Sequence, residues 1–222
     1  MGVLLMLMTI GGLVVAGILL IASLITKKAW LAKFTLGGVA VWLVFYAVML
    51  LGFSLRSKEQ VLGLNEAKEY CGFYLDCHMH SEVTSIRTAK TVGDRTAQGT
   101  FYIVGVRLFS DAKNPNITFR LLDPNAKVMV TVDSAIDRDL AAEAALPTAA
   151  VDLGGDIKGR QTIDKEIVFD IPNDLRDPKL DITEGYGIDN TIEAVLVDDE
   201  DSIRHARTYF ALTPQTQLAG VE

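Results

Sequence analysis

The first 55 residues contain two long apolar runs separated by a short basic loop. The runs are Val3–Ile25 and Phe34–Leu55, and the charged side chains before Arg56 are all lysines: Lys27, Lys28 and Lys33. A helix rises about 1.5 Å per residue, so about 20 apolar residues cross a hydrocarbon core of roughly 30 Å. Each run exceeds this length, and a helix satisfies its own backbone groups in lipid. We therefore predict two transmembrane helices, at about residues 3–25 and 34–55, that form a hairpin over residues 1–56.

After the hairpin, apolar residues recur at every second position, which is the period of a β-strand with one buried face. The clearest case is Phe101–Phe109, where Tyr102, Val104, Val106 and Leu108 share one face. We predict strands at residues 79–88, 101–109, 117–122, 127–132, 167–171, 179–183, 191–197 and 208–213. Many short strands with turn signals between them are typical of a two-sheet sandwich. The predicted fold is two transmembrane helices followed by an all-β, immunoglobulin-like sandwich.

The remaining segments set the predicted boundaries. Residues 57–70 mix charged and apolar side chains and are expected to form a tether, so the sandwich is placed at 71–214 and a flexible tail at 215–222. Asp123-Pro124-Asn125-Ala126 predicts a hairpin turn between its flanking strands. Ile136–Gly159 is long for a loop in a compact domain and is expected to be functional or mobile, with a short helix at 141–146.

The lysines of the loop predict the orientation of the hairpin. Basic residues in short loops stay on the cytoplasmic side, and the loop holds three whereas the N-terminal tail holds none. Both termini are then on the non-cytoplasmic side of a cell membrane, the inner or plasma membrane, although Arg56 and Lys58 favour the opposite orientation. A cleaved signal peptide is the alternative for the first run, but that run lacks a basic start and is longer than a usual signal core.

Charge excludes one class of partner. The chain carries −7 overall, and the part after Leu55 holds 18 basic and 28 acidic side chains, a net charge of −10. Such an acidic domain repels phosphate backbones, so nucleic acid is excluded as a partner. The lipid bilayer is the partner that the apolar runs predict.

The densest cluster of reactive side chains lies between Cys71 and His80. Cys71 and Cys77 are the two cysteines of the chain, and in a non-cytoplasmic compartment we expect them to form a disulfide. The alternative is a zinc or copper site, because Asp76, His78 and His80 alternate and share one face of a strand. His205 would complete that set if its segment lies alongside. The spacing of these residues matches no standard zinc motif. We therefore predict no cofactor, and zinc or copper remains the alternative.

Motifs of catalysis are missing from the sequence. There is no G-x-S-x-G nucleophile elbow, and the cysteines do not form a redox-active C-x-x-C pair. Asp198–Asp201 lacks the alternating ligands and central glycine of a calcium loop, so we interpret it as a solvated turn. We therefore expect a protein that is not an enzyme.

Four segments resemble a known family. They are Gly99–Phe109, Phe119–Val128, Ile163–Pro172 and Lys179–Ile182. Their order, a long strand, a short hairpin and then a strand ending in Phe-Asp-Ile-Pro, is similar to that of the DUF4352 family. That resemblance implies a telokin-like, immunoglobulin-like sandwich held at a bacterial membrane, and it supplies no catalytic residue. The chain departs from the family pattern where Asn125-Ala126 stands in place of a glycine, in the Ile136–Gly159 insertion, and in its double-helix anchor.

Together these observations predict a non-enzymatic binding or interaction module of the cell envelope. Its sheet edges and the Ile136–Gly159 loop would be offered to an envelope protein partner. The alternative is a metal-binding envelope protein that uses the cluster from Cys71 to His80.

Overall fold

The computed structural model describes residues 2–71, 77–121, 124–131, 134–149, 153–185 and 187–213. The chain divides into two compact units. The first joins residues up to 59 with residues 187–207, and the second joins residues 60–186 with those from 208 onward. The chain therefore passes between the units three times.

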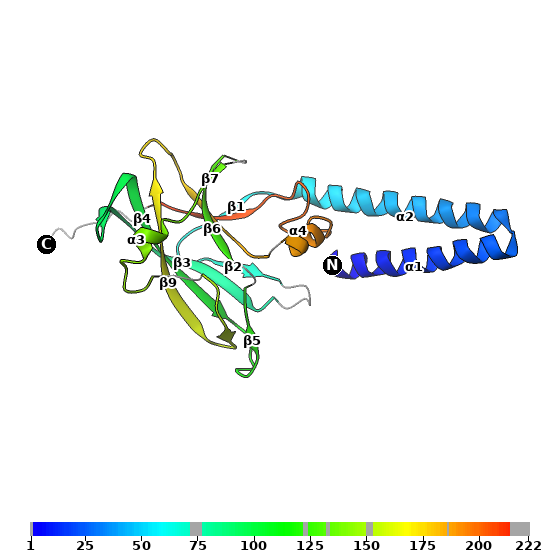
Figure 1. Ribbon diagram of the computed structural model, residues 1–222, viewed down its shortest axis with the longest axis horizontal. Coiled ribbons are helices and arrows are strands. Elements are labelled where there is room, and N and C mark those ends of the chain that lie inside the picture. The colour runs from blue at the N-terminus through cyan, green and yellow to red at the C-terminus, as the bar shows by residue number, and fades with distance from the viewer. Residues whose placement is uncertain are drawn as a thin grey trace. The chain divides into compact units, whose positions relative to one another are not determined.

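The first unit contains two long antiparallel helices, α1 at Gly2–Thr26 and α2 at Ala29–Arg56 (Figure 1). Lys27 makes the turn between them with a φ of 53°. Both helices are long and apolar enough to cross a membrane. α2 begins five residues before the predicted apolar run, because Ala29, Leu31 and Lys33 are good helix formers.

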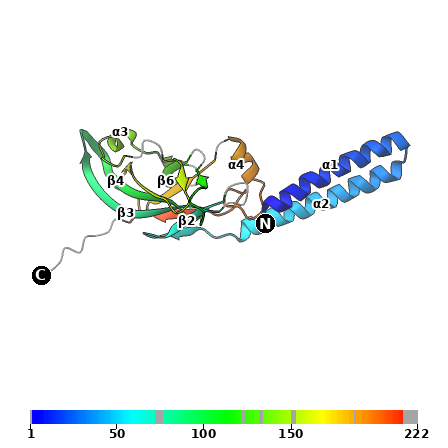
Figure 2. The same cartoon turned by 90° about the horizontal axis from the view of Figure 1, so that it is seen from below.

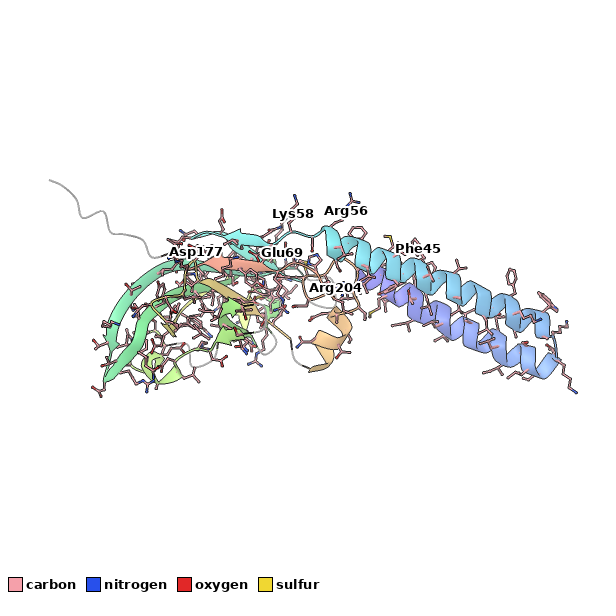
Figure 3. All side chains as sticks on the ribbon, turned by 90° about the horizontal axis from the view of Figure 1, so that it is seen from above. Phe45, Arg56, Lys58, Glu69, Asp177 and Arg204 are labelled. Carbon is pink, nitrogen blue, oxygen red and sulfur yellow. A yellow bond between two sulfur atoms is a disulfide. The ribbon has the colours of Figure 1, made fainter. Side chains whose placement is uncertain are left out.

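Most apolar side chains of these helices are not covered by protein. Figure 3 shows them standing out from both helices, with Phe45 on the side of α2 away from α1. Leu24 and Phe34 are 77% and 78% exposed. A polar contact between the helices is the hydrogen bond that Trp42 Nε1 donates to Thr9 Oγ1 at 3.0 Å. The helical hairpin thus has an apolar outer surface.

The first unit also contains α4, at Gly187–Glu193. The prediction of a strand at Thr191–Val197 is therefore wrong. Ala194 N donates to Asn190 O, and Leu196 N donates to Glu193 O, so short-range helical bonds and turns take the place of a strand ladder. Apolar residues in a short run fit either structure, and here the local bonds decide.

The second unit is a sandwich of two main sheets. The first sheet is antiparallel except for the parallel pairing of its edge strand β1 with β11. Its strands, in spatial order, are β1 (Gln60–Leu62), β11 (Thr208–Ala211), β10 (Lys179–Thr183), β6 (Asn125–Thr131) and β7 (Ser134–Ile136).

The second sheet is built around a long hairpin whose strands curve together (Figure 2). Its strands, in spatial order, are β2 (Ala67–Tyr70), β3 (Met79–Val92), β4 (Arg95–Ser110) and β9 (Thr162–Ile171). A further two-stranded sheet pairs β5 (Thr118–Phe119) with β8 (Ile157–Lys158). The architecture confirms the predicted sandwich after two helices.

Two further predicted features differ from the structure. Residues 57–70 are not a tether throughout, because they contain β1 and β2, and the sandwich begins at Gln60. The hairpin predicted around residues 123–126 is wrong, since β5 pairs with β8 whereas β6 pairs with β10 and β7. The strands β1, β5 and β8 are too short to leave a periodic signal, and each is fixed by a partner distant in sequence.

The core confirms the predicted period of two. Val104, Val106 and Leu108 of β4 lie between the sheets, with Tyr102 packed against them. The alternate β4 residues Phe101 and Ile103 point to the opposite face and form a second buried cluster. The second sheet, which contains β3 and β4, is therefore buried on both faces over part of its length.

Residues 139–148, part of the predicted Ile136–Gly159 loop, cover this second cluster and the edge of β9. They contain α3 (Leu140–Glu143), close to the helix predicted at 141–146. Asp139 N donates to Val168 O at 2.8 Å, Val168 N donates to Glu143 Oε1 at 2.9 Å, and Glu166 N donates to Thr148 O at 3.0 Å. Exposed strand edges invite pairing with other chains, and here residues 139–148 satisfy the edge instead. Residues 139–148 belong to the loop that is predicted to bind a partner, and in the structure they pack against β9 instead.

Candidate functional site

The disulfide predicted between Cys71 and Cys77 is present. It joins the end of β2 to the start of β3, so it fixes the β2–β3 hairpin of the second sheet. With the cysteines six positions apart in the sequence, the loop-closure model gives a stabilisation of about 2 kcal/mol. Residues 72–76 lie outside the described residues, and the candidate ligand Asp76 is among them.

Two of the three histidines of the chain meet at one carboxylate. His78 Nδ1 lies 2.6 Å from Asp111 Oδ1, and His80 Nε2 lies 3.6 Å from the same oxygen. Asp111 directly follows β4, and His78 directly precedes β3. The β3–β4 register pairs Met79 with Ser110, so the two strand ends bring these side chains together. We call His78, His80 and Asp111 the histidine–aspartate cluster.

Aromatic rings hold both imidazoles of this cluster. The His80 ring stacks on Phe109 with centroids 5.0 Å apart, and the His78 ring meets Phe119 edge-on at 5.8 Å. The His80 side chain is 15% exposed, whereas those of His78 and Asp111 are about half exposed. His80 Nε2 is buried and has no hydrogen-bond partner within the described part of the chain. The cluster thus combines an accessible His–Asp pair with a second, shielded imidazole nitrogen.

The hydrogen bond from His78 lowers the pKa of the Asp111 carboxyl, with smaller contributions from the charges of His80 and His78. A carboxyl whose folded pKa lies below its unfolded value stabilises the fold above the unfolded value, about pH 4. This contribution is lost as the pH falls through the folded pKa.

Substitution of Asp111 by asparagine tests this pH dependence. We expect Asp111→Asn to lower the melting temperature at pH 7, and we expect the difference from the wild type to shrink as the pH falls below about 4. Thermal unfolding of both chains between pH 3 and pH 8 measures it, with Asp174→Asn at an exposed carboxyl as the control. A difference that stays constant over this range contradicts the assignment.

The other predicted ligand, His205, belongs to the first unit, where its Nδ1 lies 2.8 Å from Ala206 O. Among the described residues, the candidate ligand atoms of Glu69, Cys71 and Cys77 all lie within 4.8 Å of one another, whereas those of the histidine–aspartate cluster are farther apart. Both sulfurs of that group are in the disulfide and offer no thiolate to a metal. The histidine–aspartate cluster is therefore the remaining candidate for binding a cation, and its three ligand atoms would have to move closer together to share one ion.

Asp111 was missed by sequence reasoning, although a signal for it existed. Gly93-Asp94 forms the turn of the β3–β4 hairpin, and Val92 pairs with Arg95 across it. Counting outward from that turn brings residue 79 opposite residue 108, and the two register shifts on the way move the pairing to residue 110. Asp111, which follows β4, is then placed beside His78, which precedes β3.

A second candidate site is the outer edge of β3. β2 covers this edge opposite residues 79–82, and Asn65 N donates to Val83 O. In the described part of the chain, no strand pairs with the edge from Ser85 to Thr91. Arg87, Thr88 and Lys90 are exposed there. We call residues 85–91 the open β3 edge.

Comparison with known proteins gives a limited result. No family model matches the chain, and no curated protein matches it in sequence. Solved structures that it is similar to include the yjhA protein from Bacillus subtilis, with 13% identity over 68% of this chain and 98% of that one at a TM-score of 0.41.

The secreted protein MPT63 from Mycobacterium tuberculosis aligns with 10% identity over 60% of this chain and all of that one, also at a TM-score of 0.41. An uncharacterised β-sandwich protein from Clostridium difficile aligns with 7% identity over 71% of this chain and 98% of that one, at a TM-score of 0.28. At this level of similarity, the sandwich assignment depends on the strand pairing described above.

Proposed function

We propose that this chain is a membrane-anchored module whose β-sandwich binds an envelope protein on the non-cytoplasmic side, without catalysing a reaction. The observation that carries the proposal is the pair of long apolar helices, whose most apolar 18-residue windows are 11% and 6% buried. In water such a surface would be strongly unfavourable, and in a bilayer it is the expected one. The DUF4352 resemblance supports the same assignment, since that family holds such sandwiches at bacterial membranes.

Extraction of membranes tests the anchoring. The full chain should stay in the membrane pellet after washing at high salt and at alkaline pH, and detergent should release it. A variant in which Leu13, Ile18, Val41 and Val44 are all replaced by arginine should fail to insert, because each such charge costs about 3 kcal/mol or more at the centre of a membrane helix. Release of the unmodified chain by alkaline washing contradicts the proposal.

The open β3 edge is the surface we propose for the partner. An extended peptide can add to such an edge through main-chain hydrogen bonds. Lys90 and the two register shifts of β3 disfavour pairing with a second copy of the same edge. Arg87 pairs with Glu166 and Lys90 donates to Gly99 O, yet both side chains remain exposed, and their positive charge favours an extended segment that carries acidic side chains.

Photocrosslinking in living cells tests this edge. A photoreactive residue at Thr88 should give one discrete adduct, and the same residue at Thr118, an exposed threonine of the small β5–β8 sheet, should not. The Thr88 adduct should weaken when Arg87 and Lys90 are both replaced by glutamate. Equal labelling at Thr88 and Thr118 contradicts a partner at this edge.

A second candidate function is the binding of zinc or copper by the histidine–aspartate cluster. The buried, unpartnered His80 Nε2 beside the Asp111 carboxylate favours it, because imidazole and carboxylate together suit these ions. Native mass spectrometry of the full chain with added zinc would then show one bound ion. Replacing both His78 and His80 by alanine should abolish it, whereas His205→Ala should not. Loss of zinc binding in neither variant, or in the His205 variant alone, contradicts this function.

A further inference from the structure

The connection between β10 and β11 is held against the two apolar helices by three contacts within the first unit. Tyr46 OH donates to Val195 O at 2.6 Å, and Ala206 N donates to Ser57 Oγ at 2.7 Å. The α-carbon of Gly2 lies so close to Val197 O that a side chain at position 2 would clash with this carbonyl. Residues 187–207 are therefore docked on the helical hairpin, and we call them the docked connection.

The register of the hairpin places this connection at one end of the apolar surface. Thr9 of α1 is bonded to Trp42 of α2, and the two helices run antiparallel. Gly2, seven residues before Thr9, therefore lies level with about Met49, seven residues after Trp42. α2 continues from there to Arg56, about 10 Å beyond the start of α1. Its full length of 28 residues is about 42 Å, which exceeds the roughly 30 Å of a hydrocarbon core. The last turns of α2 thus extend past the level where the two helices run together.

The docked connection lies beside the last turns of α2. Leu50 and Ser54, in the last turns of α2, are 8% and 2% exposed. Tyr46, one turn below Leu50, uses its hydroxyl to hold Val195. Tyrosines are enriched where a membrane helix leaves the hydrocarbon, with the ring in the apolar layer and the hydroxyl at its polar boundary. The Tyr46 bond therefore marks the boundary of the bilayer beside the docked connection.

The outer surface of the docked connection is apolar at two neighbouring points. Val195 and Ile203 are 40% and 48% exposed, whereas Leu196 and Val197 are 4% exposed each. Ile203 N donates to Ala194 O at 3.0 Å, which brings the two exposed side chains into the same part of the connection. Asp198–Asp201 form the turn between them, with Asp201 N bonded to Asp199 Oδ1. This composition suits the polar–apolar boundary of a bilayer and not its hydrocarbon centre.

We infer that the docked connection is a third membrane contact, which places Val195 and Ile203 in the interfacial layer of the non-cytoplasmic leaflet. The inference depends on the proposed anchoring by α1 and α2, because Tyr46 of α2 holds Val195 of the connection. Because the connection leaves the sandwich after β10 and returns at β11, the chain enters the membrane-associated unit twice. The bilayer surface is thus a binding partner of the connection as well as of the helices.

Spin labelling of the full chain in lipid nanodiscs tests this contact. A nitroxide is attached to Val195→Cys or Ile203→Cys, and to matched residues of the sandwich with similar exposure, Val130→Cys (43%) and Ile117→Cys (46%). Collision with oxygen, which concentrates in lipid, is compared with collision with a water-soluble nickel chelate. The oxygen-to-nickel ratio should be severalfold higher at positions 195 and 203 than at positions 130 and 117.

A label at Val41→Cys, 73% exposed in the middle of α2, separates the two possible failures. If position 41 shows lipid contact but positions 195 and 203 match positions 130 and 117, the third membrane contact is wrong and the anchoring stands. If position 41 also behaves as water-exposed, the anchoring itself is wrong. Equal ratios at positions 195 and 130 overturn the inference in either case.

Discussion

Replacing Lys68 by methionine is expected to lower the free energy of unfolding by about 3–5 kcal/mol. Lys68 and Asp181 face each other inside the sandwich, with Nζ and Oδ1 3.8 Å apart and both side chains 5% exposed. Removing one member of a buried ion pair leaves the other charge without compensation, and this costs far more than loss of a surface pair.

The same lysine also bridges the two sheets. From β2 of one sheet, Lys68 Nζ donates to Ile182 O of β10 at 3.0 Å and to Thr208 O of β11 at 3.3 Å, both in the other sheet. Tyr70 OH donates to Ile182 O as well, at 3.2 Å. The substitution therefore removes polar bonds that tie the layers together, in addition to the charge.

Urea unfolding of the full chain in detergent, followed by circular dichroism of the sheet, measures this loss. Lys113→Met, at an exposed lysine, is the control and should change the free energy of unfolding by less than about 0.5 kcal/mol. The double variant Lys68→Met with Asp181→Leu should recover part of the loss, because it leaves no single buried charge. A cost below about 1 kcal/mol for Lys68→Met contradicts the buried pair.

Replacing Glu143 by alanine is the second change with a large expected effect, again about 3–5 kcal/mol. The Glu143 side chain is 3% exposed and accepts two bonds from Arg138, at 2.9 and 2.5 Å. Its Oε1 also accepts from Val168 N on the edge strand β9. Alanine would leave a guanidinium and a backbone N–H without these partners.

Hydrogen exchange of the full chain should show where the structure loosens. In Glu143→Ala, peptides that cover β9 (Thr162–Ile171) should exchange faster, whereas peptides of β10 should change little. Glu143→Gln is the matched control, because it keeps an oxygen for Val168 N and loses the charge, so its effect should be smaller. Unchanged exchange in β9 for both variants would show that residues 139–148 do not protect this edge.

The parts of the fold predicted from sequence are those with a strong local period. Both apolar runs are helices, and the face shared by Val104, Val106 and Leu108 lies between the sheets. β10 was predicted with its bounds of Lys179–Thr183. In each case the burial pattern repeats often enough within one segment to identify the element.

The parts missed depend on partners distant in sequence. β1 has three residues and is a strand because it lies beside β11, about 150 positions away. The apolar residues near Val195 suggested a strand, but they are helical or in turns, and their burial comes from the first unit. For the site, the disulfide was predicted from compartment and spacing, whereas Asp111 needed the register of the β3–β4 hairpin.

Labelling of single cysteines in sealed membrane vesicles of known orientation tests the central claim, that the helices span the bilayer with the sandwich on the non-cytoplasmic side. A membrane-impermeant maleimide is offered to Ala29→Cys, at the start of α2 beside the loop between the helices, and to Lys113→Cys, on the sandwich, while the Cys71–Cys77 disulfide stays oxidised. From the non-cytoplasmic side, position 113 should react and position 29 should react only after detergent is added. The reverse pattern, or reaction of both positions before detergent, contradicts this topology.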